Sequence, residues 1–161
     1  DADGNETKRS TDTSKVTGKE IIDGVSWFVV DEFGYEFWIR IGNEGTEEGL
    51  VVPDPAPNSQ KMIVERKWLF FKHPVKVNET YPVGEAELEQ KVVVSAVDKP
   101  ITVPAGTFKC VVYDIIGPQG LISQISLAPG TGIVKFEFPT GYGEEESPQT
   151  RELREFSPGS P

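Results

Sequence analysis

A single histidine and a single cysteine limit the nucleophilic chemistry open to this chain. His73 stands directly before Pro74, at the expected end of a strand, and no G-x-S-x-G or other nucleophile motif lies near it. Cys110 alternates in register with Phe108 and Val112, so its thiol is expected to face the core as a small apolar group. We therefore predict that neither residue is catalytic and that the chain is not an enzyme.

Acidic residues are the remaining candidates, and their chemistry would be metal binding. The first five residues, D-A-D-G-N, have the spacing that opens a calcium loop, but Glu6 occupies the position that needs glycine and Asp12 the position that needs glutamate. The acidic runs at 44–48 and 144–146 are typical of solvated loops. Together with the single histidine and cysteine, these patterns predict no metal site and no cofactor.

The composition is that of one acidic, turn-rich domain. Among 161 residues, 16 Lys+Arg stand against 26 Asp+Glu, a net charge of −10, and there are 16 glycines and 13 prolines. This charge disfavours a phosphate backbone, so nucleic acid is not an expected partner. The length predicts a single β domain over 15–156, between a flexible leader at 1–14 and a flexible tail at 157–161. No membrane-spanning segment is expected, because glycine, proline and polar residues interrupt the uncharged stretch 115–134.

Much of the chain alternates side chains with a period of two, which is typical of strands. In residues 35–41 a tyrosine, a phenylalanine and two isoleucines fall on one face, while Trp38 falls on the other with Glu36 and Arg40. This predicted strand is therefore apolar on both sides. Both faces would need cover, either from the rest of the sheet or from a ligand or partner.

Turn residues separate these strands at short intervals. Asp23-Gly24 is the strongest hairpin signal, and Pro53–Asn58 is the clearest irregular loop. No window shows an apolar stripe of helical period, and residues 63–71 fit a strand better than a helix. We predict an all-β fold, a single antiparallel meander of about nine or ten strands that is strongly bent into a half-open barrel.

Two sequence elements resemble those of a known group of proteins. Residues 101–110 read I-T-V-P-A-G-T-F-K-C, and residues 127–135 read L-A-P-G-T-G-I-V-K. They are similar to the V-P-A-G-T-F and A-P-G-x-G-x-V-K elements of uncharacterised bacterial secreted and lipid-anchored β-proteins. The closing strand at 151–156 also resembles theirs, whereas the upstream element at 74–81 matches only in part. The resemblance covers residues 60–156.

The resemblance implies an extracytoplasmic protein, periplasmic or at the cell surface, and often lipid-anchored. It also implies an antiparallel sheet bent into a half-open barrel, similar in outline to lipoprotein carriers that hold acyl chains. The anchoring cysteine of such proteins is not among these 161 residues, so an anchor would lie outside them.

Both motifs are expected to shape the fold rather than to do chemistry. In the first, a proline ends the pairing of a strand, a glycine lets the backbone turn, and a phenylalanine enters the core. In the second, two glycines are expected at positive φ or in a bulge. The residues assigned to these turns are Pro104, Gly106, Phe108, Pro129, Gly130 and Gly132.

Three aromatic residues, Trp38, Trp68 and Phe70, are the candidates for a ligand or partner surface. One hypothesis is a structural or interaction subunit of a bacterial envelope or membrane complex, which docks through an edge strand or the Pro53–Pro57 loop. The alternative is a lipoprotein-like binding module that holds an apolar or acyl ligand in the concave face of the sheet. We favour the first, because sheets of this size usually fill their own interior.

Overall fold

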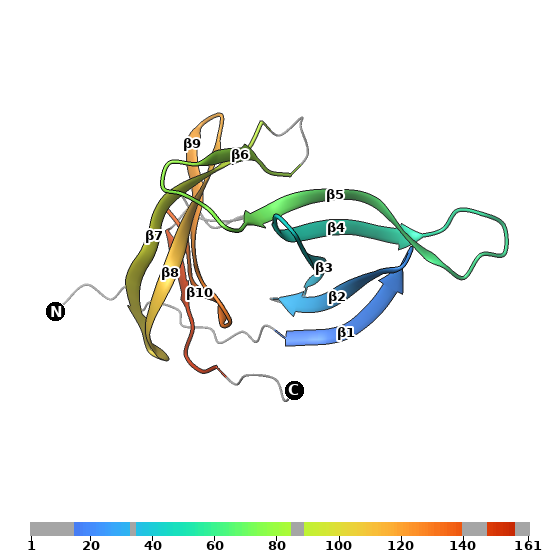
Figure 1. The fold of residues 1–161 in the computed structure, drawn as a ribbon, viewed down its shortest axis with the longest axis horizontal. Helices are drawn as coiled ribbons and strands as arrows, with labels where there is room; N and C mark the ends of the chain where they lie inside the picture. The colour runs from blue at the N-terminus through green and yellow to red at the C-terminus, as the bar shows by residue number, and fades with distance from the viewer. Residues whose placement is uncertain (1–14, 33–34, 85–88, 140–147, 157–161) are drawn as a thin grey trace, which may run out of the picture. The chain divides into compact units, whose positions relative to one another are not determined.

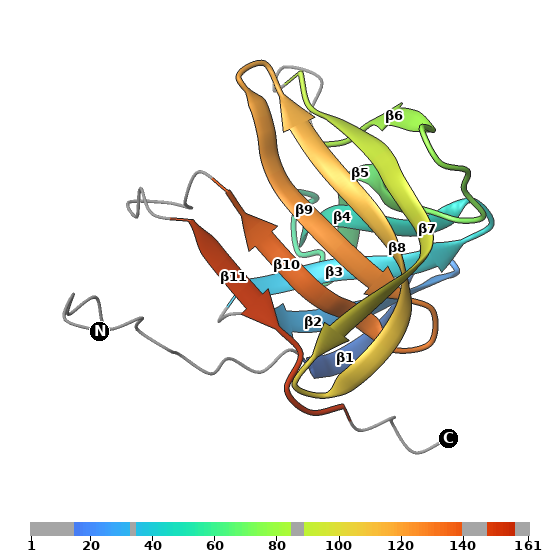
Figure 2. The same ribbon diagram turned by 90° about the vertical axis from the view of Figure 1, so that its left-hand side faces the viewer.

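A computed structural model of the chain describes residues 15–32, 35–84, 89–139 and 148–156. The described residues form strands, turns and loops and contain no helix, which confirms the all-β prediction. Eleven strands are described (Figures 1 and 2): β1 (Lys15–Ile22), β2 (Val25–Glu32), β3 (Tyr35–Gly42), β4 (Gly45–Pro53), β5 (Met62–Lys72), β6 (Thr80–Pro82), β7 (Lys91–Val103), β8 (Gly106–Gly117), β9 (Gly120–Ala128), β10 (Gly132–Phe138) and β11 (Gln149–Glu152).

The described strands form two antiparallel sheets, so a single meander is not confirmed. One sheet has the order β1-β2-β3-β4-β5 and the other the order β11-β10-β9-β8-β7-β6, and neither closes into a barrel within the described residues. The change of sheet follows β5, where Pro74 has no N–H to continue the pairing and a turn closes from the Glu79 N–H to the Lys76 carbonyl (3.1 Å). The next strand, β6, then pairs with β7.

The described residues group into two compact units. One contains the described residues up to Gly42 together with Thr46–Lys67, and the other contains Asn43–Gly45 together with the described residues from Trp68 onward. Each unit is built around one of the sheets, although β4 and β5 contribute residues to both units. The single domain expected over 15–156 stays a prediction, and the leader and tail lie outside the described residues.

The first unit begins with the hairpin that the sequence predicted. Asp23 and Gly24 join β1 to β2 with φ of 50° and 77°, the left-handed pair of a type I′ turn whose twist matches that of the strands. Trp27 on β2 is 2% exposed and is the largest fully buried side chain among the described residues. Its indole lies against Gly49 of β4, where an added Cβ would come within 2.6 Å of the ring.

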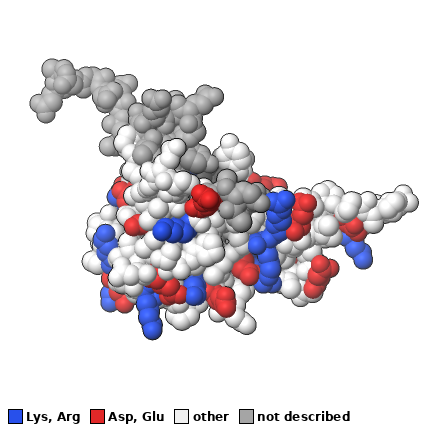
Figure 3. All heavy atoms as spheres, turned by 90° about the horizontal axis from the view of Figure 1, so that it is seen from above, with Lys and Arg blue, Asp and Glu red and all other residues white. Residues whose placement is uncertain are grey.

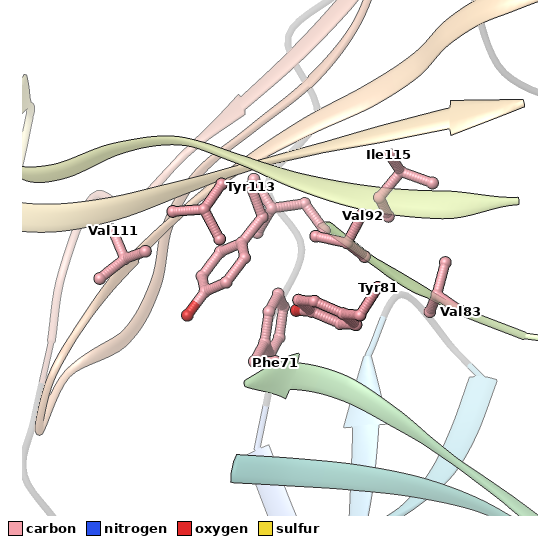
Figure 4. Close-up of a cluster of buried hydrophobic side chains, with 9 residues drawn as sticks. Phe71, Tyr81, Val83, Val92, Val111, Tyr113 and Ile115 are labelled. Atoms are coloured by element: carbon pink, nitrogen blue, oxygen red, sulfur yellow. The ribbon is translucent and has the colours of Figure 1, made fainter. Parts of the chain in front are cut away.

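The second unit has its main core between the end of β5 and the strands β6 to β9. Figure 4 shows Phe71 beside Tyr81 and Tyr113, with valine and isoleucine side chains of the neighbouring strands around them. The core strand β8 is buried on both faces, because the consecutive residues Val111, Val112 and Tyr113 are all buried. The buried residues of this cluster are Phe71, Tyr81, Val83, Val92, Val94, Val111, Tyr113, Ile115 and Ile125.

The first motif turn joins β7 to β8 and carries a second, smaller core. Val103 pairs with Gly106, whose φ is 132°, so the pairing ends at Pro104 as predicted. The Ala105 N–H donates to the Leu153 carbonyl (3.1 Å), which ties this turn to the chain after β11. Phe108 is half-buried against the small core formed by Val103, Cys110, Ala128 and Val134.

The second motif turn joins β9 to β10, directly after Ala128. The Thr131 N–H donates to the Ala128 carbonyl (3.1 Å) across Pro129 and Gly130. Gly130 and Gly132 have φ of 76° and 103°, which confirms the predicted positive φ. The register then shifts between Ile133 and Lys135, and a bulge of this kind bends the strand that carries it.

Candidate interaction surface

The register of β1, β2 and β3 separates their side chains onto two faces. Val16 lies opposite Val30, and Val30 lies opposite Phe37. Because directly opposed residues in antiparallel strands share a face, the register and the alternation along each strand identify one continuous apolar set. We call it the β1–β3 apolar face, and its members are Val16, Ile21, Phe28, Val30, Tyr35, Phe37, Ile39 and Ile41.

This face is open to water at its borders. Val16 is 63% exposed, Ile21 72%, Tyr35 68% and Ile41 79%, while the other four members are half-buried. Folded chains usually leave large apolar side chains exposed singly, and a contiguous group marks an interaction site. The β1–β3 apolar face is therefore the strongest candidate for a functional surface in the part of the chain that the structure describes.

Few charged residues fall on the β1–β3 apolar face. By register, Lys19 falls on it opposite Phe28, and Glu32 falls on it opposite Tyr35 at its border. The Lys19 ammonium lies 5.7 Å from the centroid of the Phe28 ring. That placement is a cation–π contact, which lets the lysine stem cover the aromatic ring. Figure 3 shows a different pattern on the surface seen from above, where basic and acidic side chains are interspersed.

The opposite face of the same strands is covered. There Trp27 and Val29 are buried, and the Arg40 guanidinium lies 5.6 Å from the Trp27 ring. Arg40 also forms an ion pair with Glu47, whose second oxygen is 3.5 Å from the Lys67 ammonium. The hydrogen bond from Arg40 lowers the pKa of Glu47 below its usual value, against the opposing effect of burial.

The three aromatic residues selected from the sequence lie elsewhere. Trp38 pairs with Val29 on the covered face of the first unit and is half-buried. Trp68 and Phe70 lie two residues apart on β5 and pack, half-buried, against the main core of the second unit. The structure therefore places Trp68 and Phe70 together and describes Trp38 in a separate unit, so a shared aromatic surface stays a prediction.

Sequence reasoning found the strand of Tyr35 and Ile41 but did not select these residues. The alternation in 35–41 correctly placed Trp38 on the face opposite Tyr35, Phe37 and Ile39. It could not tell which of two apolar faces would be covered. The structure resolves this, because Trp27 lies against Gly49 of β4 and so marks the side on which the strands pack.

Two tyrosine hydroxyls occupy the edge of β5 near its end. The Tyr81 hydroxyl donates to the Phe70 carbonyl (3.0 Å) and accepts from the Lys72 N–H (3.1 Å). The Tyr113 hydroxyl donates to the Lys72 carbonyl (3.0 Å) and lies 3.3 Å from each ring nitrogen of His73. Burial raises the pKa of Tyr81 to about 12 and also raises the pKa of Tyr113. Both phenols therefore stay protonated and can donate.

The single histidine and cysteine are placed for packing. Burial lowers the pKa of His73, so its neutral form is favoured beside Tyr113. Cys110 is 1% exposed, and burial raises the pKa of its thiol, which disfavours the reactive thiolate. Within the described ranges no three His, Cys, Asp or Glu residues gather as a metal site would require. The calcium-like segment 1–12 and the acidic run 144–146 lie outside those ranges.

The Pro53–Pro57 loop, named from the sequence as a docking element, is held by internal hydrogen bonds. The Asp54 N–H donates to the Lys61 carbonyl (2.9 Å), and the Ala56 N–H donates to the Asp54 carboxylate (2.9 Å). The Ala56 bond lowers the pKa of Asp54 below its usual value. The loop is thus a defined surface feature between β4 and β5.

Comparison with known proteins does not add to this picture. No family model matches the chain, and neither a curated protein nor a solved structure matches it significantly. Among the described residues there is no helix of the length and apolar character needed to cross a membrane.

Proposed function

We propose that the chain is a non-enzymatic β-protein that acts as a structural or interaction subunit of a bacterial envelope or membrane complex. The observation that carries the proposal is the β1–β3 apolar face, with Tyr35 and Ile41 exposed at its border. Burying such a face is favourable by about 25 cal/mol for each Å² of apolar surface removed from water. A protein partner with a complementary apolar surface would supply that cover.

The extracytoplasmic location and a lipid anchor are parts of the same proposal. They are supported by the two motifs at 101–110 and 127–135, which resemble those of bacterial secreted and lipid-anchored proteins. The half-open barrel is supported by the second sheet, where β7 shifts register between Val94 and Ala96 and again before Lys99. The bond from Ala105 to Leu153 brings the β7–β8 turn toward the opposite edge of that sheet.

The alternative function, a module that holds an apolar or acyl ligand, has one specific observation in its favour. Trp68 and Phe70 are half-buried beside the main core of the second unit, so part of each aromatic side chain is available to a ligand. An acyl mass retained in native mass spectrometry of the envelope-extracted protein would favour this function.

The interaction proposal is tested by site-specific photocrosslinking in envelope preparations of the native host. A photoreactive amino acid at Ile41 samples the β1–β3 apolar face, and the same group at Glu36 samples the opposite face of the same strand. We expect a discrete protein adduct from position 41 with at least about fivefold higher yield than from position 36. Equal yields at both positions, or no adduct at position 41, would contradict the proposal.

A further inference from the structure

The four edges of the two sheets differ in how open they are. The edge strand β5 has its last backbone groups occupied by the hydroxyls of Tyr81 and Tyr113. The edge strands β6 and β11 have only 3 and 4 residues. The remaining edge, β1, has 8 residues, and β2 is the only described strand that pairs with it. Half of its N–H and C=O groups therefore point away from the sheet.

An irregularity in β1 restricts what can pair with this edge. The register with β2 shifts between Val16 and Gly18, so Thr17 is an extra residue without a partner in the ladder. Before the bulge, Lys15 and Val16 lie on the two different faces of the sheet. Because of the extra residue, Lys19 shares the face of Val16 beyond the bulge, and Glu20 shares the face of Lys15. If a regular strand paired with β1, its side chains would fall on the same faces as those of β1 on only one side of Thr17. They would do so on both sides only if that strand had one residue fewer at this point, as β2 does.

We propose that β1 pairs with β1 of a second copy of this chain, antiparallel, about a two-fold axis between Thr17 and Gly18. In this register Lys15 of each copy lies opposite Glu20 of the other, and Val16 lies opposite Lys19. The faces match on both sides of the bulge, because the extra residue of one copy is compensated by the extra residue of the other. Two Lys–Glu pairs then form across the axis, with Cβ atoms about 5 Å apart.

Two other symmetric registers of the same edge are less favourable. A two-fold axis through Lys19 places the two lysines directly opposite each other, and an axis through Glu20 does the same with the two glutamates. Like charges directly opposed destabilise an antiparallel pair. The register about Thr17 and Gly18 combines matched faces with opposite charges, which makes the edge self-complementary.

This inference is separate from the proposed function, because it concerns the edge of the sheet and not its apolar face. Glu20 lies opposite Trp27 on the covered face, away from Tyr35 and Ile41. Pairing of two copies would join their sheets edge to edge and place the two β1–β3 apolar faces side by side. A partner would then meet an apolar surface of twice the width.

Charge reversal tests the pairing on the full chain by sedimentation velocity over a concentration series. At physiological ionic strength the Debye length is about 8 Å, so the net charge of −10 on each copy is screened while directly opposed pairs still interact. We expect wild type to associate to a dimer as concentration rises. Glu20→Lys and Lys15→Glu should each weaken association about tenfold, since each replaces two attractive pairs by two repulsive ones.

The double variant Lys15→Glu/Glu20→Lys restores both pairs with their signs exchanged, so we expect its dimer constant to return to within about threefold of wild type. Glu36→Lys, which makes the same charge change on β3 of the same face, is the matched control and should associate like wild type. A wild-type chain that stays monomeric at all concentrations, or a double variant as weak as the single ones, would overturn the inference. Crosslinking from Ile41 would still report on the proposed function.

Discussion

At the scale of single residues, two tyrosines of the second unit form hydrogen bonds with backbone groups that an edge strand leaves unpaired. The end of β5 presents the Phe70 carbonyl and both backbone groups of Lys72 to one side, and unpaired groups of this kind invite association or cost free energy when buried. Two phenols from other strands occupy all three groups. Their rings pack in the core at the same time, with Phe71 and Tyr113 centroids 5.1 Å apart.

Tyr81→Phe should therefore lower the free energy of unfolding by about 1–3 kcal/mol, because it leaves the Phe70 carbonyl and the Lys72 N–H without their shared partner. Tyr113→Phe removes one donated bond and should cost less, about 1 kcal/mol. Urea unfolding followed by tryptophan fluorescence measures both. Tyr35→Phe, whose side chain is 68% exposed, is the control and should be neutral. A neutral Tyr81→Phe would contradict this account of the edge.

Part of this residue-scale picture could be read from the sequence. Cys110 was predicted to face the core, and it is buried. Tyr113, which falls on the opposite face of the same strand, is buried as well, because β8 is covered on both sides. Alternation assigns faces but does not say how many of them are covered, and a tyrosine in such a strand needs a hydroxyl partner that only the tertiary structure supplies.

At the scale of elements, the strands and turns follow from local chemistry. The Asp23-Gly24 hairpin and the glycines at 130 and 132 have the positive φ that their sequence requires. The strand over 63–71 is observed as β5. The division into two sheets could not be predicted from local chemistry, because it depends on where pairing between strands stops along the chain. Pro74 was visible in the sequence, but a proline after a strand ends a ladder without saying what the next strand will pair with.

Trp27 packs closely against Gly49, so the space between β2 and β4 is limited there. A Cβ at position 49 would lie 2.6 Å from the Trp27 Cζ3 atom and 2.7 Å from Cη2, so Gly49→Ala should destabilise the chain by about 1–3 kcal/mol through overpacking. Trp27→Phe removes the atoms that clash. The double variant should therefore be more stable than the sum of the single effects predicts, by at least about 0.5 kcal/mol.

Urea unfolding of the two single variants and the double variant measures this coupling. Gly18→Ala is the matched control, because its Cβ would meet Val29 at an ordinary 3.6 Å. That variant should change stability much less than Gly49→Ala. Additive effects of Gly49→Ala and Trp27→Phe would show that the indole does not limit the space at position 49.

At the scale of the whole molecule, the first three strands carry apolar residues on both faces, but the two faces differ in how far they are covered. The covered face holds both tryptophans and most of the charged residues, and the open face holds Tyr35 and Ile41. Composition alone cannot reveal this, since a mean hydropathy of −0.33 is that of an ordinary acidic protein. The asymmetry arises from register, which decides where each apolar residue lies, and it is the feature that suggests a partner.

The stability of the whole molecule should also depend on pH in two separate steps on the acid side. The pKa of His73 is lowered by burial, so the unfolded chain binds a proton that the folded chain resists, and stability falls as pH drops below the ordinary histidine value of 6.5. Hydrogen bonds lower the pKa values of Glu47, Asp54 and Glu79. The chief donor is Arg40 for Glu47 and Lys72 for Glu79. Their contribution is present above the ordinary carboxyl range and is lost as pH falls through the lowered folded values.

Urea midpoints measured from pH 8 to pH 3 resolve the two steps, and His73→Gln separates them. This variant loses the contact with Tyr113, so its midpoint is lower throughout, but its profile should be flat between pH 7 and pH 5, where that of wild type declines. Below pH 4.5 both proteins should lose stability together, because the carboxylates are unchanged. A decline in the variant between pH 7 and pH 5 equal to that of wild type would assign the upper step to another group. It would also show that the proton on His73 is not linked to folding.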